Sequence, residues 1–307
     1  MSHDVCPVTD LYTEECDCPR HRANETVGAL TGFAPGLYPN VPEWVYHGGD
    51  PRTSLSSSGA RDLLEVVPSQ WIYDREHPNR EPSEALEFGT AVHTLALSVG
   101  AAVVEVTAGD WRTKDAQRQR AEARAAGQVP LLTRQYRAAR TMADNLRLHP
   151  RLARALERGT PEMSGYWLDG ETGVLRRFRT DCLYTAPSGA VLGIDVKTAD
   201  TADPAKFLKS VLAFGYDMQN DWYADGLDHL LGAWPAFVFA VVAKKPPHLV
   251  SVVELTPEWL DRGRRRNRAA LDLFARCRAA DHWPGYGADI HQLDMPAWLH
   301  KQEEYAR

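Results

Sequence analysis

Apolar residues recur along the chain at two spacings, which predict a series of helices and strands. Helical spacing beside capping residues predicts helices from Ser56 to just before Pro68, between Ser83 and Gly100, and over 115–126, 133–148 and 257–280. A longer helical stretch over 206–231 should break near Gly215. Runs rich in β-branched and aromatic residues, bounded by turn formers, predict strands at 164–168, 174–184, 190–198, 236–243 and 249–254. This order predicts an α/β fold with a central mixed β-sheet flanked by helices.

The same pattern divides the chain of 307 residues into three parts. Residues 1–50 are rich in proline and glycine and are expected to form an irregular N-terminal arm. Residues 51–300 hold the predicted elements, with a basic helical insert at about 110–160 that we expect to lie outside the core. Residues 301–307 form a short C-terminal tail.

Composition indicates where the protein is located more than it indicates which reaction the protein performs. No apolar run approaches the roughly 20 residues that span a bilayer, and the first ten residues lack the charged and apolar pattern of a secretion signal. Five cysteines are too few for a disulfide scaffold, so a reducing, cytoplasmic location is expected. We therefore expect a protein with no membrane partner.

The net charge of −6 hides two basic regions. Residues 112–158 contain twelve Arg or Lys against four Asp or Glu, and a second cluster of arginines lies at 262–268. Such regions on an acidic chain are compatible with a groove that follows nucleic-acid phosphates. Solvated helix faces are an equally good interpretation of the charge alone.

The candidate chemistry is concentrated in two neighbouring predicted strands. Asp195 and Lys197 lie two residues apart in one strand and therefore point to the same side, while Asp181 lies in the strand before. Two carboxylates and an amine on one face suit Mg²⁺, which prefers carboxylate, water and phosphate oxygens. A cation there would polarise a phosphodiester, and the lysine would orient or deprotonate a water. A plain surface ion pair is the alternative.

Two helical features accompany these strands. His93 lies in the predicted helix between Ser83 and Gly100, and Gln219 and Tyr223 share one face of a later helix at positions i and i+4. Each feature alone is more typical of packing than of a site.

Taken in order, these segments resemble a known family. They are Leu55-Ser56-Ser57-Ser58, Phe88-Gly89-Thr90-Ala91-Val92-His93, Tyr166-Trp167-Leu168-Asp169, Arg179-Thr180-Asp181, Ile194-Asp195-Val196-Lys197-Thr198, Phe207, Gly215-Tyr216, Gln219-x-x-x-Tyr223-x-Asp225-Gly226 and Trp283-Pro284-Gly285-Tyr286. The set resembles the PD-(D/E)XK nuclease superfamily, with its restriction-endonuclease-like core, and within it the exonuclease VIII (RecE-type) family of phage recombination exonucleases. Arg179-Thr180-Asp181 departs from the Arg-Pro-Asp triplet common in that family but keeps the aspartate.

The resemblance implies a role for each candidate residue. Asp181, Asp195, His93 and the Val196 carbonyl would ligate Mg²⁺, for which Mn²⁺ could substitute, and Lys197 would position or activate the water. Gln219 and Tyr223 would hold the DNA strand or the lysine, and Glu162, expected just before the first strand, would support the ligands.

The resemblance also implies an activity and partners. The chain would be a Mg²⁺-dependent exodeoxyribonuclease that acts on linear double-stranded DNA ends, 5′ to 3′, and leaves 3′ single strands for a RecT-like annealing protein. A homo-oligomeric ring is a further implication. An endonuclease of the same superfamily, or a catalytically silent DNA-binding or assembly protein, are the alternatives.

Two other groups of residues remain open in the sequence. Arg177 and Arg179 share a strand face and would contact phosphate or pair with surface carboxylates, whereas Arg176 should face away. Near the N-terminus, four side chains could close a structural Zn²⁺ site or be free groups in a flexible arm: Cys6, Cys16, Cys18 and His21.

Overall fold

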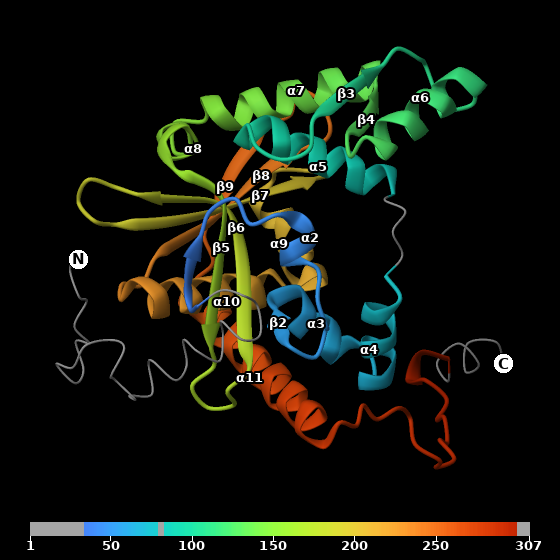
Figure 1. Ribbon diagram of the computed structural model, residues 1–307, viewed down its shortest axis with the longest axis vertical. Helices are drawn as coiled ribbons and strands as arrows, with labels where there is room; N and C mark the ends of the chain where they lie inside the picture. The colour runs from blue at the N-terminus through green and yellow to red at the C-terminus, as the bar shows by residue number, and fades with distance from the viewer. Residues whose placement is uncertain (1–33, 79–82, 300–307) are drawn as a thin grey trace.

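The structure, a computed structural model, describes residues 34–78 and 83–299. Its centre is a seven-stranded mixed sheet in which the strands run in the order β1-β5-β6-β7-β8-β9, with β2 paired to β6 (Figure 1). The strands are β1 (Gly36–Tyr38), β2 (Ser54–Ser56), β5 (Thr160–Leu168), β6 (Leu175–Thr185), β7 (Val191–Ala199), β8 (Ala236–Ala243) and β9 (Val250–Val253). The predicted α/β fold with a mixed central sheet is confirmed.

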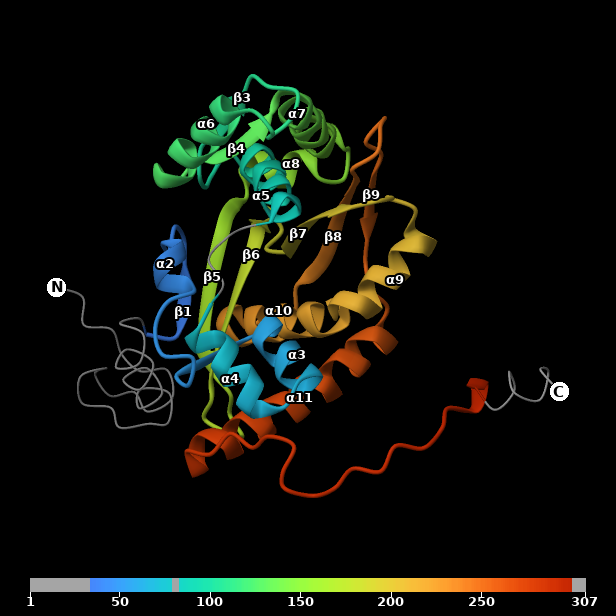
Figure 2. The same cartoon turned by 90° about the vertical axis from the view of Figure 1, so that its right-hand side faces the viewer.

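Helices cover both faces of this sheet, which gives three layers (Figures 1 and 2). One face is covered by α5 (Glu84–Leu97), α7 (Thr133–Leu148) and α8 (Ala153–Arg158), whose apolar side chains share a core with β7 and β8. The other face is covered by α3 (Ser57–Glu65), α4 (Pro68–Glu76), α9 (Pro204–Phe214), α10 (Tyr216–Leu231) and α11 (Pro257–Ala280). Each layer buries one apolar helix stripe against the sheet, as such folds require.

The break between α9 and α10 falls where the sequence predicts it. Gly215 adopts φ +62°, in the left-handed region that glycine enters at no steric cost, and it ends α9 as α10 begins. The following residue, Tyr216, is thereby turned back toward the sheet, where its ring stacks on Phe207 and Phe239.

The helical insert differs from its prediction, because it contributes to the core. It contains α6 (Lys114–Ala125), and its strand β4 (Val129–Leu132) pairs in parallel with β3 (Val103–Val106). One face of α7 is fully buried against α5 and the sheet through Ala139, Met142 and Leu146. The basic residues lie on the opposite face, so the prediction that this segment stands outside the core is wrong.

The first helix ends before Pro68, as predicted, and Pro68 also begins α4 as its first residue, a position that proline favours because no amide hydrogen is needed there. Two further expectations need correction. The first long strand begins at Thr160 rather than at 164, so Glu162 lies within β5 and not before it. The described part of the N-terminal arm is not irregular, since it forms β1 and α2 (Glu43–Tyr46) against β5.

None of the helices within the described ranges combines the length and the apolar character needed to cross a membrane. The predicted C-terminal tail and the N-terminal Cys6, Cys16, Cys18 and His21 lie outside the described residues.

Candidate active site

A fork in the central sheet creates the candidate site. β6 pairs with β7 only as far as Cys182 and Ile194, and beyond this pair the two strands separate. Asp181 and Asp195 are the next residues at the mouth of the fork. The Ile194 carbonyl, released from the ladder, accepts a hydrogen bond from the Thr180 hydroxyl at 3.0 Å. The fork therefore accommodates two buried carboxylates between the separated strands without leaving that carbonyl unsatisfied.

A third carboxylate lies at the same level of the sheet. The ladder between β5 and β6 pairs Pro161 with Cys182 and Met163 with Thr180, which places Glu162 across from Asp181, although these two are not themselves paired. Glu162 has φ +50°, an unusual backbone conformation for a residue with a side chain. Like charges directly opposite one another destabilise a sheet, so this arrangement has a cost that the fold alone does not explain.

Residues from both helical layers reach this row of acids. From α5, His93 Nδ1 lies 3.3 Å from Asp181 Oδ2, and the Val196 amide donates to the same oxygen at 2.6 Å. Across the fork, Lys197 Nζ lies 2.5 Å from Asp195 Oδ1, and the Gln219 amide on α10 donates to Asp195 Oδ2. The structure therefore brings together the four residues that were predicted to converge: His93, Asp181, Asp195 and Lys197.

The charge of the site is negative and only partly balanced. Burial and the charge of Asp181 raise the pKa of Glu162 to about 7, and burial, opposed in part by Lys197, raises the pKa of Asp195. Burial disfavours a charged His93, but the neighbouring Asp181 carboxylate outweighs it and raises its pKa to about 9. Burial acts to raise the pKa of Asp181, but the charges of His93 and Lys197 outweigh burial, so this pKa is lowered.

The pKa of Lys197 is raised despite burial, because Asp195 favours its charged form. Its ammonium group also lies 4.6 Å from the centre of the Tyr216 ring. Tyr216 is therefore a residue of the site to which the sequence analysis gave no role. Its sequence signals are its place directly after the helix-breaking Gly215 and the presence of Gly215-Tyr216 among the segments of the family resemblance.

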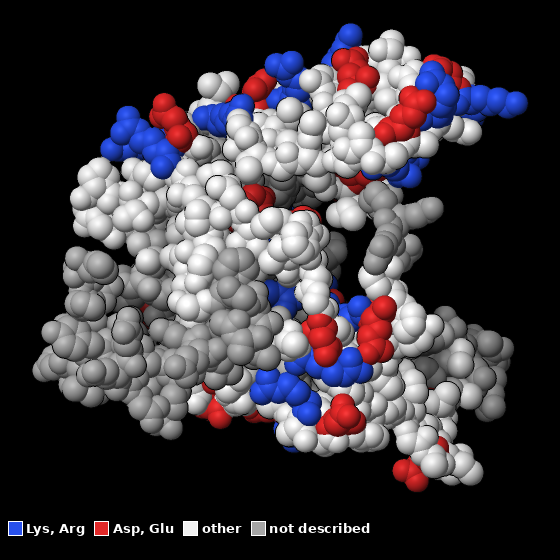
Figure 3. Space-filling model, in the orientation of Figure 1, with Lys and Arg blue, Asp and Glu red and all other residues white. Residues whose placement is uncertain are grey.

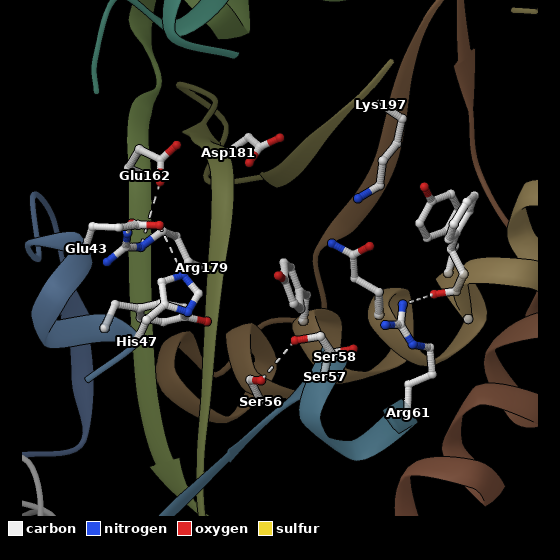
Figure 4. A pocket seen from close by; sticks show the side chains of 16 residues that line it. Glu43, His47, Ser56, Ser57, Ser58, Arg61, Glu162, Arg179, Asp181 and Lys197 are labelled. Carbon is white, nitrogen blue, oxygen red and sulfur yellow. Dashed lines mark hydrogen bonds and ion pairs between the residues drawn. The ribbon is translucent and has the colours of Figure 1, made fainter. Parts of the chain in front are cut away.

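Two cavities meet at these residues. The first, of about 300 Å³, is lined by Asp181, Lys197, Gln219, Tyr223 and the serines that begin α3 (Figure 4). In Figure 4, Glu162 and Asp181 lie on one side of it and Lys197 on the other. The second cavity, of about 680 Å³, is lined by His93 and by small or apolar residues of α5. Both share Glu43, Glu162 and Arg179, so these three residues form the wall between them.

The three arginines of β6 have different surroundings. Arg179 reaches both cavities but is held by Glu43 at 2.6 Å and by the Val41 carbonyl. Arg177 lines neither cavity and donates to Ser54. The guanidinium groups of Arg177 and Arg179 both lie against the Tyr46 ring, as expected of residues on one strand face. Arg176 faces away, paired with Asp225 and stacked between Trp167 and Trp222.

Gln219 and Tyr223 line the first cavity, with different surroundings from those expected. Gln219 contacts Asp195 rather than the lysine, and Tyr223 is packed between Phe178 and Phe237.

The donor set of the site suits a hard divalent cation. Carboxylate oxygens dominate, with one imidazole and the Val196 carbonyl nearby, which are ligands that Mg²⁺ and Mn²⁺ accept. Among residues 34–78 and 83–299, no three His, Cys, Asp or Glu side chains already form a closed metal-binding group. A cation would therefore have to take the place of the ion pairs from Asp195 to Lys197 and from Asp181 to His93.

Comparison with known proteins agrees with this geometry. A search of curated proteins finds no match. The crystal structure of a protein named "Putative exonuclease" from Eubacterium rectale shares the fold at a TM-score of 0.57 and 14% identity, covering 82% of this chain and 93% of that one. A second structure, SSO0001, has 13% identity, coverage of 73% and 84%, and a TM-score of 0.28, too low to carry an argument.

A family model provides the assignment. The model described as a PDDEXK-like domain of unknown function matches residues 56–294, which include Asp181, Asp195 and Lys197. The matched range begins at the serine that caps α3 and extends past α11, so it contains both helical layers and almost the whole sheet. The chain belongs to this PDDEXK-like family and has the fold of the PD-(D/E)XK nuclease superfamily.

Proposed function

We propose that the protein is a metal-dependent deoxyribonuclease. The observation that carries the proposal is the row formed by Glu162, Asp181 and Asp195 at the mouth of a sheet fork. Lys197 is paired with Asp195 and faces the other two acids across a cavity. Membership of a PDDEXK-like family and a fold shared with a protein named as an exonuclease support it.

The residues of the chain have distinct tasks in this proposal. A Mg²⁺ ion, when bound, would polarise the scissile phosphate and make a water more acidic. Asp181, Asp195, His93 and the Val196 carbonyl would hold that ion. Lys197, released from Asp195 and steadied by the Tyr216 ring, would orient the attacking water beside the phosphate.

The two cavities suggest how a DNA strand would lie. The first offers Lys197, Arg61 and serine hydroxyl groups, which suit phosphate oxygens, and the second offers small and apolar side chains, which suit a sugar and base. A strand crossing the wall between them would present one phosphate to the acids. Gln219 would hold Asp195 in place while the ion binds.

We further propose that the activity is exonucleolytic on linear duplex ends, 5′ to 3′, as the exonuclease VIII resemblance implies. The 3′ single strand would then pass to an annealing protein, with the nuclease itself assembled as a ring. An endonuclease that uses the same acids, and a DNA-binding protein without catalysis, are the alternatives.

Digestion of labelled DNA tests the proposal. Purified full-length protein is incubated with linear duplex, labelled at the 5′ or the 3′ end, and with closed circular duplex, each with Mg²⁺ and with EDTA. The proposal expects Mg²⁺-dependent loss of the 5′ label first from linear DNA, and intact circles. Cutting of circles would indicate the endonuclease. Salt-sensitive binding without cleavage in Mg²⁺ or Mn²⁺ would contradict a nuclease.

A further inference from the structure

A row of arginines on the outer helical layer has no carboxylate at ion-pair distance among residues 34–78 and 83–299. The row comprises Arg134, Arg137 and Arg140 on α7, and Arg151 and Arg154 at α8, all of them exposed. We refer to these five residues as the α7–α8 ridge. Within the described ranges, none of their guanidinium groups has a carboxylate at ion-pair distance. Figure 3 shows Lys and Arg side chains spaced along this upper margin of the molecule, with Asp and Glu side chains between them.

The ridge differs from the other arginine-rich helix of the protein. On α11, Arg262 and Arg266 both reach the buried Asp217, Arg264 pairs with Asp261, and Arg268 holds Asp169 at 2.9 Å. These four arginines are neutralised within the fold, and in the described part of the cluster at 262–268 only Arg265 is exposed without a carboxylate at ion-pair distance.

The spacing of the ridge opposes folding rather than assisting it. Arg134, Arg137 and Arg140 follow one another at i+3, and like charges at that spacing repel on a helix. The buried face of α7 requires none of them, because its core contacts come from alanine, methionine and leucine. Their charges therefore suit an external polyanion.

We propose that the α7–α8 ridge binds the phosphate backbone of double-stranded DNA, outside the active site. None of its residues lines either cavity at the acids, so it is a second contact surface. On α7 the ridge runs from Arg134 to Arg140, about 9 Å along the helix axis, which is the length of about three base-pair steps. This proposal rests on the proposed function only in taking DNA as the ligand.

The surroundings of the ridge favour duplex DNA over other anionic partners. Proteins that hold single strands stack bases on aromatic rings, and in α7 and α8 no aromatic side chain is exposed. A membrane-binding helix needs an exposed apolar face, whereas Leu148 is the large apolar residue exposed in this segment of the described chain. Evenly spaced cations without apolar anchors match a phosphate backbone.

The test compares two variants that remove equal charge from the same helical layer. Arg137→Ala/Arg154→Ala removes two ridge residues. Arg112→Ala/Arg118→Ala removes two exposed arginines that are already paired, with Asp110 and with Asp115 and Glu122. Binding of a labelled 40-base-pair duplex is measured by fluorescence anisotropy in EDTA, between 50 and 200 mM KCl, after thermal melting has shown that both variants fold.

The ridge variant should bind the duplex about tenfold more weakly at 50 mM KCl, and its log–log salt slope should decrease in magnitude by about 2. The paired variant should match the wild type within about twofold. Equal weakening of both variants would assign the effect to net charge, and no weakening of the ridge variant would remove the site. Either result overturns the proposal.

Further ligands test the identity of the partner. The ridge variant should lose less affinity for a 40-nucleotide single strand than for the duplex. An equal loss of affinity for both would overturn the assignment of the ridge to duplex DNA. The same two variants are tested for binding to polyglutamate and to phosphatidylserine vesicles. If the ridge substitutions weaken either of these more than they weaken duplex binding, the assignment to duplex DNA is overturned. Digestion of the same duplex in Mg²⁺ is measured separately. Duplex binding that depends on the ridge, without digestion, would contradict the proposed nuclease activity but support the ridge as a DNA-binding surface. Digestion together with binding that does not depend on the ridge would support the nuclease and overturn the ridge proposal.

Discussion

Buried acids occur in two settings in this protein, and their partners distinguish the settings. Glu87 lies between Arg120 and Arg124, at 2.8 and 2.7 Å, and Asp217 lies between two arginines of α11. In the sheet fork, by contrast, one histidine and one lysine serve Asp181 and Asp195, and the Nε atom of Arg179, which Glu43 also holds, comes no closer than 3.8 Å to Glu162. Arginine partners outweigh burial and lower the pKa of Glu87, whereas Glu162 and Asp195 have raised values.

This difference separates acids that hold the fold together from acids kept for chemistry. Where an arginine faces each carboxylate, removal of the acid leaves a buried unpaired cation and destabilises the protein. Where acids face one another, removal of one relieves repulsion and should cost activity instead. Four predictions test this distinction.

The largest effect is expected for Lys197→Ala. Loss of the amine should reduce the rate of duplex cleavage by about 10²–10⁴-fold, the range typical of a group that moves or positions a proton. The measurement is initial rate on end-labelled duplex in Mg²⁺. Lys209→Ala, which removes a lysine of α9 that lines neither cavity, is the control and should retain wild-type activity. Cleavage by Lys197→Ala at the wild-type rate would place this residue outside the mechanism.

The second prediction concerns the structural setting. Glu87→Gln should lower the free energy of unfolding by about 3 kcal/mol, since it removes the buried carboxylate that Arg120 and Arg124 share. Urea unfolding measures the change. The neighbouring Glu84→Gln, whose more exposed carboxylate lies 3.6 Å from Arg120, should have little effect. Equal losses in the two variants would mean that burial of Glu87 is not what matters.

The third prediction is that stability depends on pH with opposite sign for Glu162 and for Glu87. The pKa of Glu162 is about 7 in the folded chain against 4.5 without the fold, so the folded state binds the extra proton between these values. Metal-free protein should therefore lose stability as pH rises from about 4.5 to 7, by up to about 3 kcal/mol from this group. Glu162→Gln should remove that part of the slope in urea unfolding. An unchanged slope would show that Glu162 does not carry it.

Glu87 provides the internal comparison for this experiment. Its lowered pKa means that its stabilising contribution is present above about pH 4.5 and is lost as pH falls through the lower folded value. The two glutamates should thus alter the stability profile on opposite sides of pH 4.5.

The smallest effect is expected at an exposed pair. Arg118 contacts Asp115 and Glu122 on the surface of α6, where water and salt screen the charges. Arg118→Ala should leave the melting temperature unchanged within error and leave cleavage intact. A clear loss of stability would show that ion pairs matter here irrespective of burial.

The sequence predicts the parts of the site that depend on local periodicity. Alternation along one strand places Asp195 and Lys197 on the same side, and Gly215 ends a helix where a left-handed residue is needed. Asp181 is already a candidate from its place in the strand before. The role of His93 came only from the resemblance, because the distance between a helix and a strand is set by packing. The meeting of His93 and Asp181 at 3.3 Å is a tertiary fact.

The remaining features depend on long-range pairing that local patterns do not encode. Pro161 weakens the strand signal at the start of β5, which placed Glu162 before the strand instead of opposite Asp181. The four-residue strands β3 and β4 are stable only as a pair, and their pairing spans the whole of α6. The contact of Tyr216 with Lys197 requires both the break at Gly215 and the position of β7.

The central claim is that the acids at the sheet fork hold a divalent cation, and calorimetric titration with Mn²⁺ tests it most directly. Wild-type protein should bind Mn²⁺ at a saturable site in the fork, and Asp195→Asn should abolish that binding while the protein stays folded. Glu87→Gln, which alters a buried acid of the structural kind, should bind Mn²⁺ like the wild type. Equal binding by wild type and Asp195→Asn, or no binding by either, would contradict the account.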